Sequence, residues 1–151
     1  MAIREIRTYP DKFLRQPTKP VAEINDTVQT LIDDMIETMY EEPGVGLAAI
    51  QVGSDQSVIV YDVTRAEGQR QAQALINPEI VTREGRQLSE NEGCLSVPDF
   101  RADVTRADRV RVKGLDRMGQ AVDFETDGFL SIVLQHETDH LWGVLCIDRI
   151  S

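Results

Sequence analysis

Residues 135–141 read Gln-His-Glu-Thr-Asp-His-Leu, an H-E-x-x-H sequence near the end of the chain. Apolar side chains between positions 129 and 142 cover nearly the whole circumference of a helix, which predicts a helix that runs through the core. At about 100° per residue, His136 and His140 project within about 40° of each other, and Glu137 within about 60° of His140. One helix face therefore presents two imidazoles and a carboxylate.

This face is suited to a metal. The two histidines are the only ones in the chain, and two neutral imidazoles can bind a divalent cation while Glu137 acts as a base toward water. Core histidines with chance spacing are the alternative. A catalytic site needs a third protein ligand, and only eleven residues follow His140, so we expect that ligand upstream, at Cys94. Cys146 competes with it, but residues 144–147 predict a short apolar strand with a buried, inert thiol.

The composition limits the classes of protein. At 151 residues and 17.0 kDa, we expect residues 1–151 to form a single catalytic domain. A net charge of −10 argues against a dedicated nucleic-acid binder and favours small or peptidic partners. Two cysteines are too few for a disulfide framework, which favours the reducing cytoplasm. Neither a leader peptide nor a run of transmembrane length is recognised, so no membrane association is expected.

The pattern of elements predicts an α+β fold, with small antiparallel sheets packed around the buried C-terminal helix and one amphipathic N-terminal helix. Apolar residues at spacings of three and four predict that N-terminal helix over 28–39, with Asp26 as its N-cap. Three prolines within residues 7–21 indicate an irregular arm before it. Strands are expected at 57–61, 74–76, 79–83, 109–115 and 121–126, with turns at 77–78 and 118–120.

Two further stretches leave alternatives open. Small residues at 44–53 would let another backbone or an extended ligand approach closely, although such a stretch is more often a tight turn. Basic residues between positions 101 and 117 alternate with acidic ones, which favours a solvated strand face over an anion site.

Three segments together resemble the signature motifs of peptide deformylases, in order and without a mismatch: 44–51 (GVGLAAIQ), 92–96 (EGCLS) and 135–140 (QHETDH). Residues 9–11 and 14–15 are also similar to that family, so the resemblance covers essentially the whole chain. The short gap after the first motif resembles the bacterial class that lacks an insertion there. Many bacterial members continue beyond the position of Ser151 into a C-terminal helix or tail.

The resemblance implies a metal-dependent hydrolase that removes the N-formyl group from the N-terminal formyl-methionine of nascent proteins and releases formate. It implies that Cys94, His136 and His140 bind the metal and that Glu137 is the general base, which later passes the proton to the leaving amine.

Other groups are expected around the reacting carbonyl. The side-chain amide of Gln51 and the backbone N–H of Leu95 are the donors that the family places at the oxyanion. Glu92 and Asp139 are expected beside the metal ligands, with ordinary surface carboxylates as the alternative.

The substrate is expected to bind along the same helix and the glycine-rich segments. Residues one and two turns before His136 would floor an apolar pocket for the methionine side chain, although these residues could equally be core. The expected pocket residues are Phe129, Ile132, Val133 and Val45. The peptide backbone would pair in β-like fashion with Gly44, Val45, Gly46 and Gly93, with Arg101 as a further contact.

The donor set alone favours zinc, whereas the resemblance implies Fe2+, with Zn2+, Ni2+ or Co2+ as substitutes. Formyl-methionyl peptides and the ribosome surface are the expected partners of a cytoplasmic monomer. Two rival classes stay open: a metallopeptidase that cuts internal peptide bonds, and a non-catalytic metal or binding protein. Three protein ligands beside a carboxylate that is not a ligand argue against a closed structural site.

Overall fold

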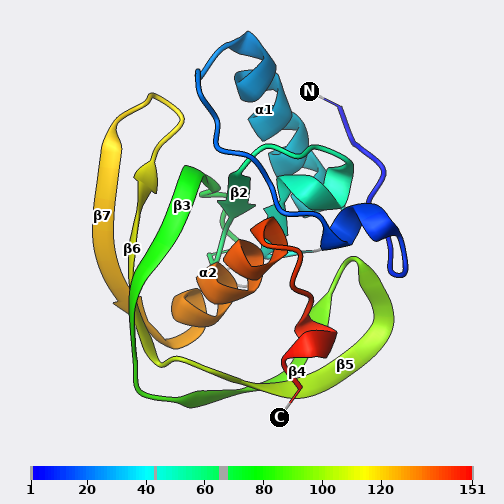
Figure 1. The fold of residues 1–151 in the computed structure, drawn as a ribbon, viewed down its shortest axis with the longest axis vertical. Helices are drawn as coiled ribbons and strands as arrows, with labels where there is room; N and C mark the ends of the chain where they lie inside the picture. The colour runs from blue at the N-terminus through cyan, green and yellow to red at the C-terminus, as the bar shows by residue number, and fades with distance from the viewer. Residues whose placement is uncertain (1, 43, 65–67, 151) are drawn as a thin grey trace.

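A five-stranded antiparallel sheet lies between helices α1 and α2 in the computed structural model, which describes residues 2–42, 44–64 and 68–150 (Figure 1). The strands in spatial order are β1 (Gly46–Ala48), β2 (Val58–Tyr61), β3 (Gln73–Glu84), β6 (Arg109–Leu115) and β7 (Ala121–Asp127). A separate two-stranded sheet pairs β4 (Gln87–Cys94) with β5 (Val97–Arg106). The predicted α+β class is confirmed.

Alternation along β2 explains why the sheet has a helix on each face. Val58 and Val60 belong to the apolar cluster of α1 (Asp26–Glu41), whereas Ile59 and Tyr61 belong to the cluster of α2 (Gly128–Leu141). Successive side chains of a strand point to opposite faces, so a strand with two covered faces is apolar throughout. Helix α2, which carries residues 136–140, covers one of these two buried faces of the sheet.

The amphipathic N-terminal helix forms as predicted, and Val28, Leu31, Ile32, Met35 and Met39 are buried on its inner face. The prediction of its first residue was wrong. The N-cap is Asn25, whose side-chain oxygen accepts a hydrogen bond from the backbone N–H of Val28 at 3.1 Å. Asp26 is the first residue inside the helix, where a negative charge is also favourable.

Helix α2 is buried in its second half but not at its ends. Phe129 is 54% exposed and Trp142 is 74% exposed, so the predicted apolar circumference is interrupted at both termini. Trp142 caps the helix, and Gly143 follows with a positive φ of 78°. Glycine adopts this left-handed conformation without the steric cost of a Cβ, which lets the helix end here.

Two strand predictions were wrong. Residues 74–76 and 79–83 form one strand, β3, whose register shifts between Ile76 and Glu79; the predicted turn at 77–78 is an irregularity within it. Residues 144–147 do not form a strand, because the chain enters a 3-10 helix at Cys146–Asp148. A short apolar run shows that a segment is buried but not which backbone conformation it adopts.

The N-terminal arm lies over the surface as predicted and bonds to segments that carry the site. The backbone N–H of Arg7 donates to Gln51 O at 2.7 Å, that of Tyr9 to Ser96 O at 2.7 Å, and that of Thr18 to Leu141 O at 2.8 Å. The arm therefore links the glycine-rich segment, the β4–β5 turn and the end of α2.

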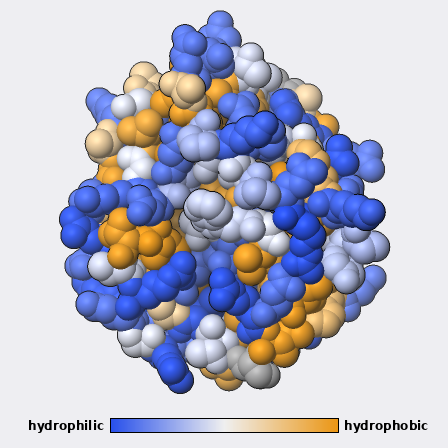
Figure 2. Space-filling model, viewed as in Figure 1, coloured by the Kyte–Doolittle hydropathy of each residue, from blue (hydrophilic) through white to orange (hydrophobic). Residues whose placement is uncertain are grey.

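Polar side chains dominate the face in Figure 2, where apolar ones form separate groups. Among the described residues, no helix combines the length and the apolar character needed to cross a membrane.

Candidate metal centre

The β4–β5 hairpin brings Cys94 to the histidines of α2. Cys94 is the last residue of β4 and is paired with Val97 at the start of β5. Neither strand was predicted, because the sequence of β4, QLSENEGC, is mostly polar and lacks a regular apolar alternation. The hairpin nevertheless carries one metal-ligand candidate and half of the wall of the adjoining cavity.

Three side chains, Cys94, His136 and His140, point potential donor atoms at one position. Cys94 Sγ lies 3.3 Å from His140 Nε2, and the two Nε2 atoms lie 3.2 Å apart. All three donor atoms lie within 4.8 Å of one another. Ligands at 2.0–2.3 Å from a tetrahedral ion are about 3.3–3.8 Å apart. The donor types, and the spacing of His140 Nε2 from the other two donor atoms, therefore fit a divalent metal.

The three donors differ in the protonation state that their surroundings favour. Burial, followed by the neighbouring His136, lowers the pKa of His140 well below its ordinary value, so this imidazole is neutral and can act as a ligand. A hydrogen bond with Cys146, burial and the charge of Glu137 raise the pKa of the Cys94 thiol. A metal ion reverses that preference by binding the thiolate.

Glu137, the neighbour of His136 in α2, has one carboxylate oxygen without a hydrogen bond in the described part of the chain. Its Oε1 atom is buried and has no hydrogen-bond partner among the described residues, and burial raises the pKa of this carboxyl to about 7. Its close approach to β1 depends on Gly46, where a Cβ would lie 2.5 Å from Glu137 Oε2. The first glycine-rich motif is therefore a place of close approach, although by a side chain of α2 rather than by the backbone or extended ligand that the small residues predicted.

His136 is oriented by Glu92, whose Oε1 lies 2.8 Å from His136 Nδ1. This hydrogen bond leaves Nε2 for a metal. Burial alone would raise the pKa of Glu92, but hydrogen bonds from His136 and Arg106 outweigh it and lower that pKa to about 2. The predicted solvated face at 101–117 was wrong for Arg106, which is only 5% exposed. Arg106 lies two residues from buried Val104 and therefore on the same face of β5, but its burial could be recognised only once Glu92 and Asp139 were placed beside it.

The amide of Gln51 is held in one orientation. Its Oε1 accepts a hydrogen bond from the backbone N–H of Ala48 at 2.9 Å, and its Nε2 donates to Ser96 Oγ at 3.0 Å. Nε2 also lies 3.7 Å from Cys94 Sγ. The amide nitrogen therefore faces the metal-ligand candidates rather than the core.

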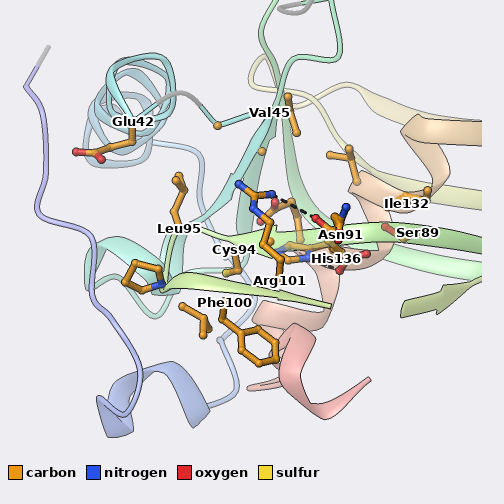
Figure 3. A pocket seen from close by; sticks show the side chains of 18 of the residues that line it. Glu42, Val45, Ser89, Asn91, Cys94, Leu95, Phe100, Arg101, Ile132 and His136 are labelled. Atoms are coloured by element: carbon orange, nitrogen blue, oxygen red, sulfur yellow. Dashed lines mark hydrogen bonds and ion pairs between the residues drawn. The ribbon is translucent and has the colours of Figure 1, made fainter. Parts of the chain in front are cut away.

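A cavity of about 460 Å³ opens onto Glu137 and His136 (Figure 3). Of the predicted catalytic, metal-binding and substrate-binding residues, only His140 is absent from its lining. Figure 3 shows Leu95 at the left of the cavity and Ile132 at the right, with Val45 above and between them. Arg101 extends along the hairpin and donates from Nη1 to Asn91 O at 3.3 Å. Sequence reasoning missed a further part of the lining: Ser89, Glu90, Asn91 and 97–100.

Thiolate and imidazole donors beside a buried carboxylate, on an H-E-x-x-H helix at the end of a cavity, define a metal-dependent hydrolase. A family model described as polypeptide deformylase matches residues 3–151. The chain belongs to the peptide deformylase family, whose members are metal-dependent enzymes that remove N-formyl groups from nascent peptides.

Curated relatives and solved structures of this family are similar to the chain over most of its length. A peptide deformylase of Thermodesulfovibrio yellowstonii is 52% identical over 151 residues, which cover all of this chain and 91% of that protein. The crystal structure of the Thermotoga maritima peptide deformylase superimposes with a TM-score of 0.93 at 42% identity, covering 100% of this chain and 99% of that one. That of Synechococcus elongatus, in complex with actinonin, gives 0.93 at 40% identity, covering 98% and 80%.

Proposed function

We propose that Cys94, His136 and His140 hold one divalent metal and that the cavity beside them deformylates formyl-methionyl peptides. The observation that carries this proposal is the convergence of three donor atoms beside the buried carboxylate of Glu137, whose Oε1 has no hydrogen-bond partner within the described ranges. A divalent metal in this place supplies Lewis-acid chemistry, because it lowers the pKa of a water molecule and polarises a carbonyl.

Glu137 acts as the general base and then as the general acid. Its carboxylate takes a proton from the attacking water and delivers it to the amine that leaves the formyl carbon. The raised pKa of this carboxyl in the metal-free site would be lowered by the charge of a bound cation, which brings it into the range that transfers a proton in both directions near neutral pH.

Gln51 and the backbone N–H of Leu95 stabilise the oxyanion that forms as water adds to the formyl group. The bonds to Ala48 and Ser96 prevent the Gln51 amide from rotating, so its nitrogen needs no reorganisation during the reaction. A preorganised donor of this kind contributes about 10² to 10³ in rate.

The methionine side chain binds on the cavity wall that α2 supplies. Ile132 is half-buried and Val133 is 4% exposed, so Val133 serves the core as well as the pocket. Phe129 is 54% exposed, which supports a role as an apolar surface that the methionine side chain covers. The substrate backbone pairs with Gly44, Val45, Gly46 and Gly93, and Arg101 lies at the cavity rim.

The native metal is Fe2+, for which Zn2+, Ni2+ and Co2+ can substitute, since imidazole and thiolate ligands accept all four. The chain acts as one catalytic domain and as a monomer in the cytoplasm, on nascent chains at the ribosome surface. An iron–thiolate site is sensitive to oxidation, so purification without oxygen is expected to raise the activity.

Steady-state formate release from formyl-Met-Ala tests the proposal. Glu137→Gln is expected to keep one metal per chain and to lose at least about 10²-fold in kcat, while Glu84→Gln, at an exposed glutamate of β3, serves as the matched control. An unformylated oligopeptide should remain uncut. A fully active Glu137→Gln variant would remove the general-base assignment, and cleavage of the oligopeptide would indicate a peptidase instead.

A further inference from the structure

Arg106 forms the centre of a buried network of charges behind the metal centre. Its side chain is 4% exposed, and it is the one buried arginine or lysine within the described parts of the chain. Arg106 Nε donates to Glu92 Oε2 at 3.2 Å, and Nη2 donates to Glu92 Oε1. Nη1 donates to Asp139 Oδ2 at 2.7 Å. One guanidinium therefore connects the end of β5 to β4 and to α2.

Both carboxylates that Arg106 holds are next to metal-ligand candidates. Glu92 contacts His136 directly, through the 2.8 Å hydrogen bond to Nδ1. Asp139 precedes His140 in the helix. A planar guanidinium that donates two parallel hydrogen bonds fixes the plane of a carboxylate as well as its position. The orientation of the His136 ring therefore depends on a residue that does not touch it.

We propose that Arg106 is a positioning residue: its guanidinium fixes the Glu92 carboxylate, and through it the His136 ring, in the orientation that presents Nε2 to the metal. This inference rests on the proposed function, because it assumes that His136 is a ligand. Groups that orient a metal-bound histidine typically contribute 10- to 100-fold to metal affinity or activity.

Arg149 extends the network toward the surface. Its Nη2 donates to Asp139 Oδ1 at 3.2 Å, and its Nε lies 3.3 Å from Asp139 Oδ2. Two buried carboxylates thereby share two guanidinium groups. Asp139 has a second cationic partner in Arg149, so Arg106 can bond to Glu92 and Asp139 at the same time. The Arg149 side chain is 48% exposed, and its effect on the metal is expected to be smaller than that of Arg106.

The test is the affinity for Co2+, measured by competition with a chelator on the folded variants. Arg106→Met is expected to weaken Co2+ binding about 10- to 100-fold, and Arg106→Lys, which keeps the charge but not the fork, is expected to lie between that variant and the parent. Arg111→Lys is the matched control, because Arg111 forms an exposed two-pronged pair with Asp123 at 2.9 and 2.8 Å. It should change the affinity by less than about twofold.

A double-mutant cycle separates positioning from general damage to the fold. If Arg106 acts through Glu92, then adding Arg106→Lys to Glu92→Gln should weaken Co2+ binding by less than about twofold beyond the effect of Glu92→Gln alone. If the two residues act independently, their separate losses of affinity would multiply. The absorption bands of bound Co2+ should shift in Arg106→Lys and remain unchanged in Arg111→Lys.

Two results would overturn the inference: parent-like Co2+ affinity in both Arg106 variants, or effects of Arg106→Lys and Glu92→Gln that multiply. If Arg106→Met does not fold, the Co2+ affinity of Arg106→Lys and the double-mutant cycle with Glu92→Gln still test the inference. A parent protein that binds no Co2+ would instead contradict the proposed metal centre itself.

Discussion

Replacing Glu137 by glutamine is expected to change how the stability of the metal-free chain depends on pH. Burial raises the pKa of Glu137 from its ordinary 4.5 to about 7 in the folded protein. Between these values the folded state retains a proton that the unfolded state has lost, so stability falls as the pH rises. Glutamine does not titrate, so the stability of the Glu137→Gln variant does not fall with pH for this reason.

The magnitude follows from the two pKa values. At pH 5 the carboxyl of the unfolded chain is only partly ionised, and the raised pKa of Glu137 lowers the free energy of unfolding by less than about 1 kcal/mol. At pH 8 the same pKa difference lowers the free energy of unfolding by more than about 3 kcal/mol. The stability of the parent, relative to Glu137→Gln, should therefore fall by about 2.5 kcal/mol between pH 5 and pH 8. Any constant effect of burying a glutamine amide cancels in this difference.

Urea unfolding after removal of metal with a chelator measures the effect at both pH values. Glu84→Gln, at an exposed position, controls for the loss of one negative charge and should unfold in parallel with the parent. A parent-to-variant difference that changes by less than about 0.5 kcal/mol from pH 5 to pH 8 would refute the reasoning, because Glu137 could not then be a buried carboxyl that favours its protonated form.

Three further changes have expected outcomes. Cys94→Ser should lower the bound metal at least tenfold, roughly the effect of losing a thiolate ligand, whereas Cys146→Ser should retain one metal per chain by elemental analysis. Gly46→Ala should lower kcat about 10²-fold through displacement of Glu137, since the new Cβ would meet Glu137 Oε2, and its bound metal should be unchanged. Leu134→Ala, at a fully buried position, should cost about 2–5 kcal/mol in the free energy of unfolding; a cost below 1 kcal/mol would mean that α2 is not a core helix.

The helices were predictable because their apolar periodicity is set by the backbone itself. Buried residues of α1 recur at spacings of three and four, and the second half of α2 is buried on all sides. The cap of α1 was misassigned by one residue because Asn25 and Asp26 are both good capping residues. Only the backbone conformation shows that Asn25 takes this position.

The β4–β5 hairpin was not predictable in the same way. The polar sequence of β4 lacks a regular apolar alternation, so the partner strand of β5 could not be recognised from the sequence. The site was predicted more fully than this part of the fold, because metal ligands are limited to a few residue types and the chain has two histidines and two cysteines. Arg106 was missed because an arginine among alternating charges gives no sign of burial until its partners are placed.

Formate release from formyl-Met-Ala by protein purified without oxygen, with the bound metal quantified in the same sample, tests the central claim most directly. The account predicts turnover in proportion to metal content, with about one iron per chain at full activity. Chains that carry one metal each and release no formate would contradict it, because the three-ligand site would then stand without the proposed reaction.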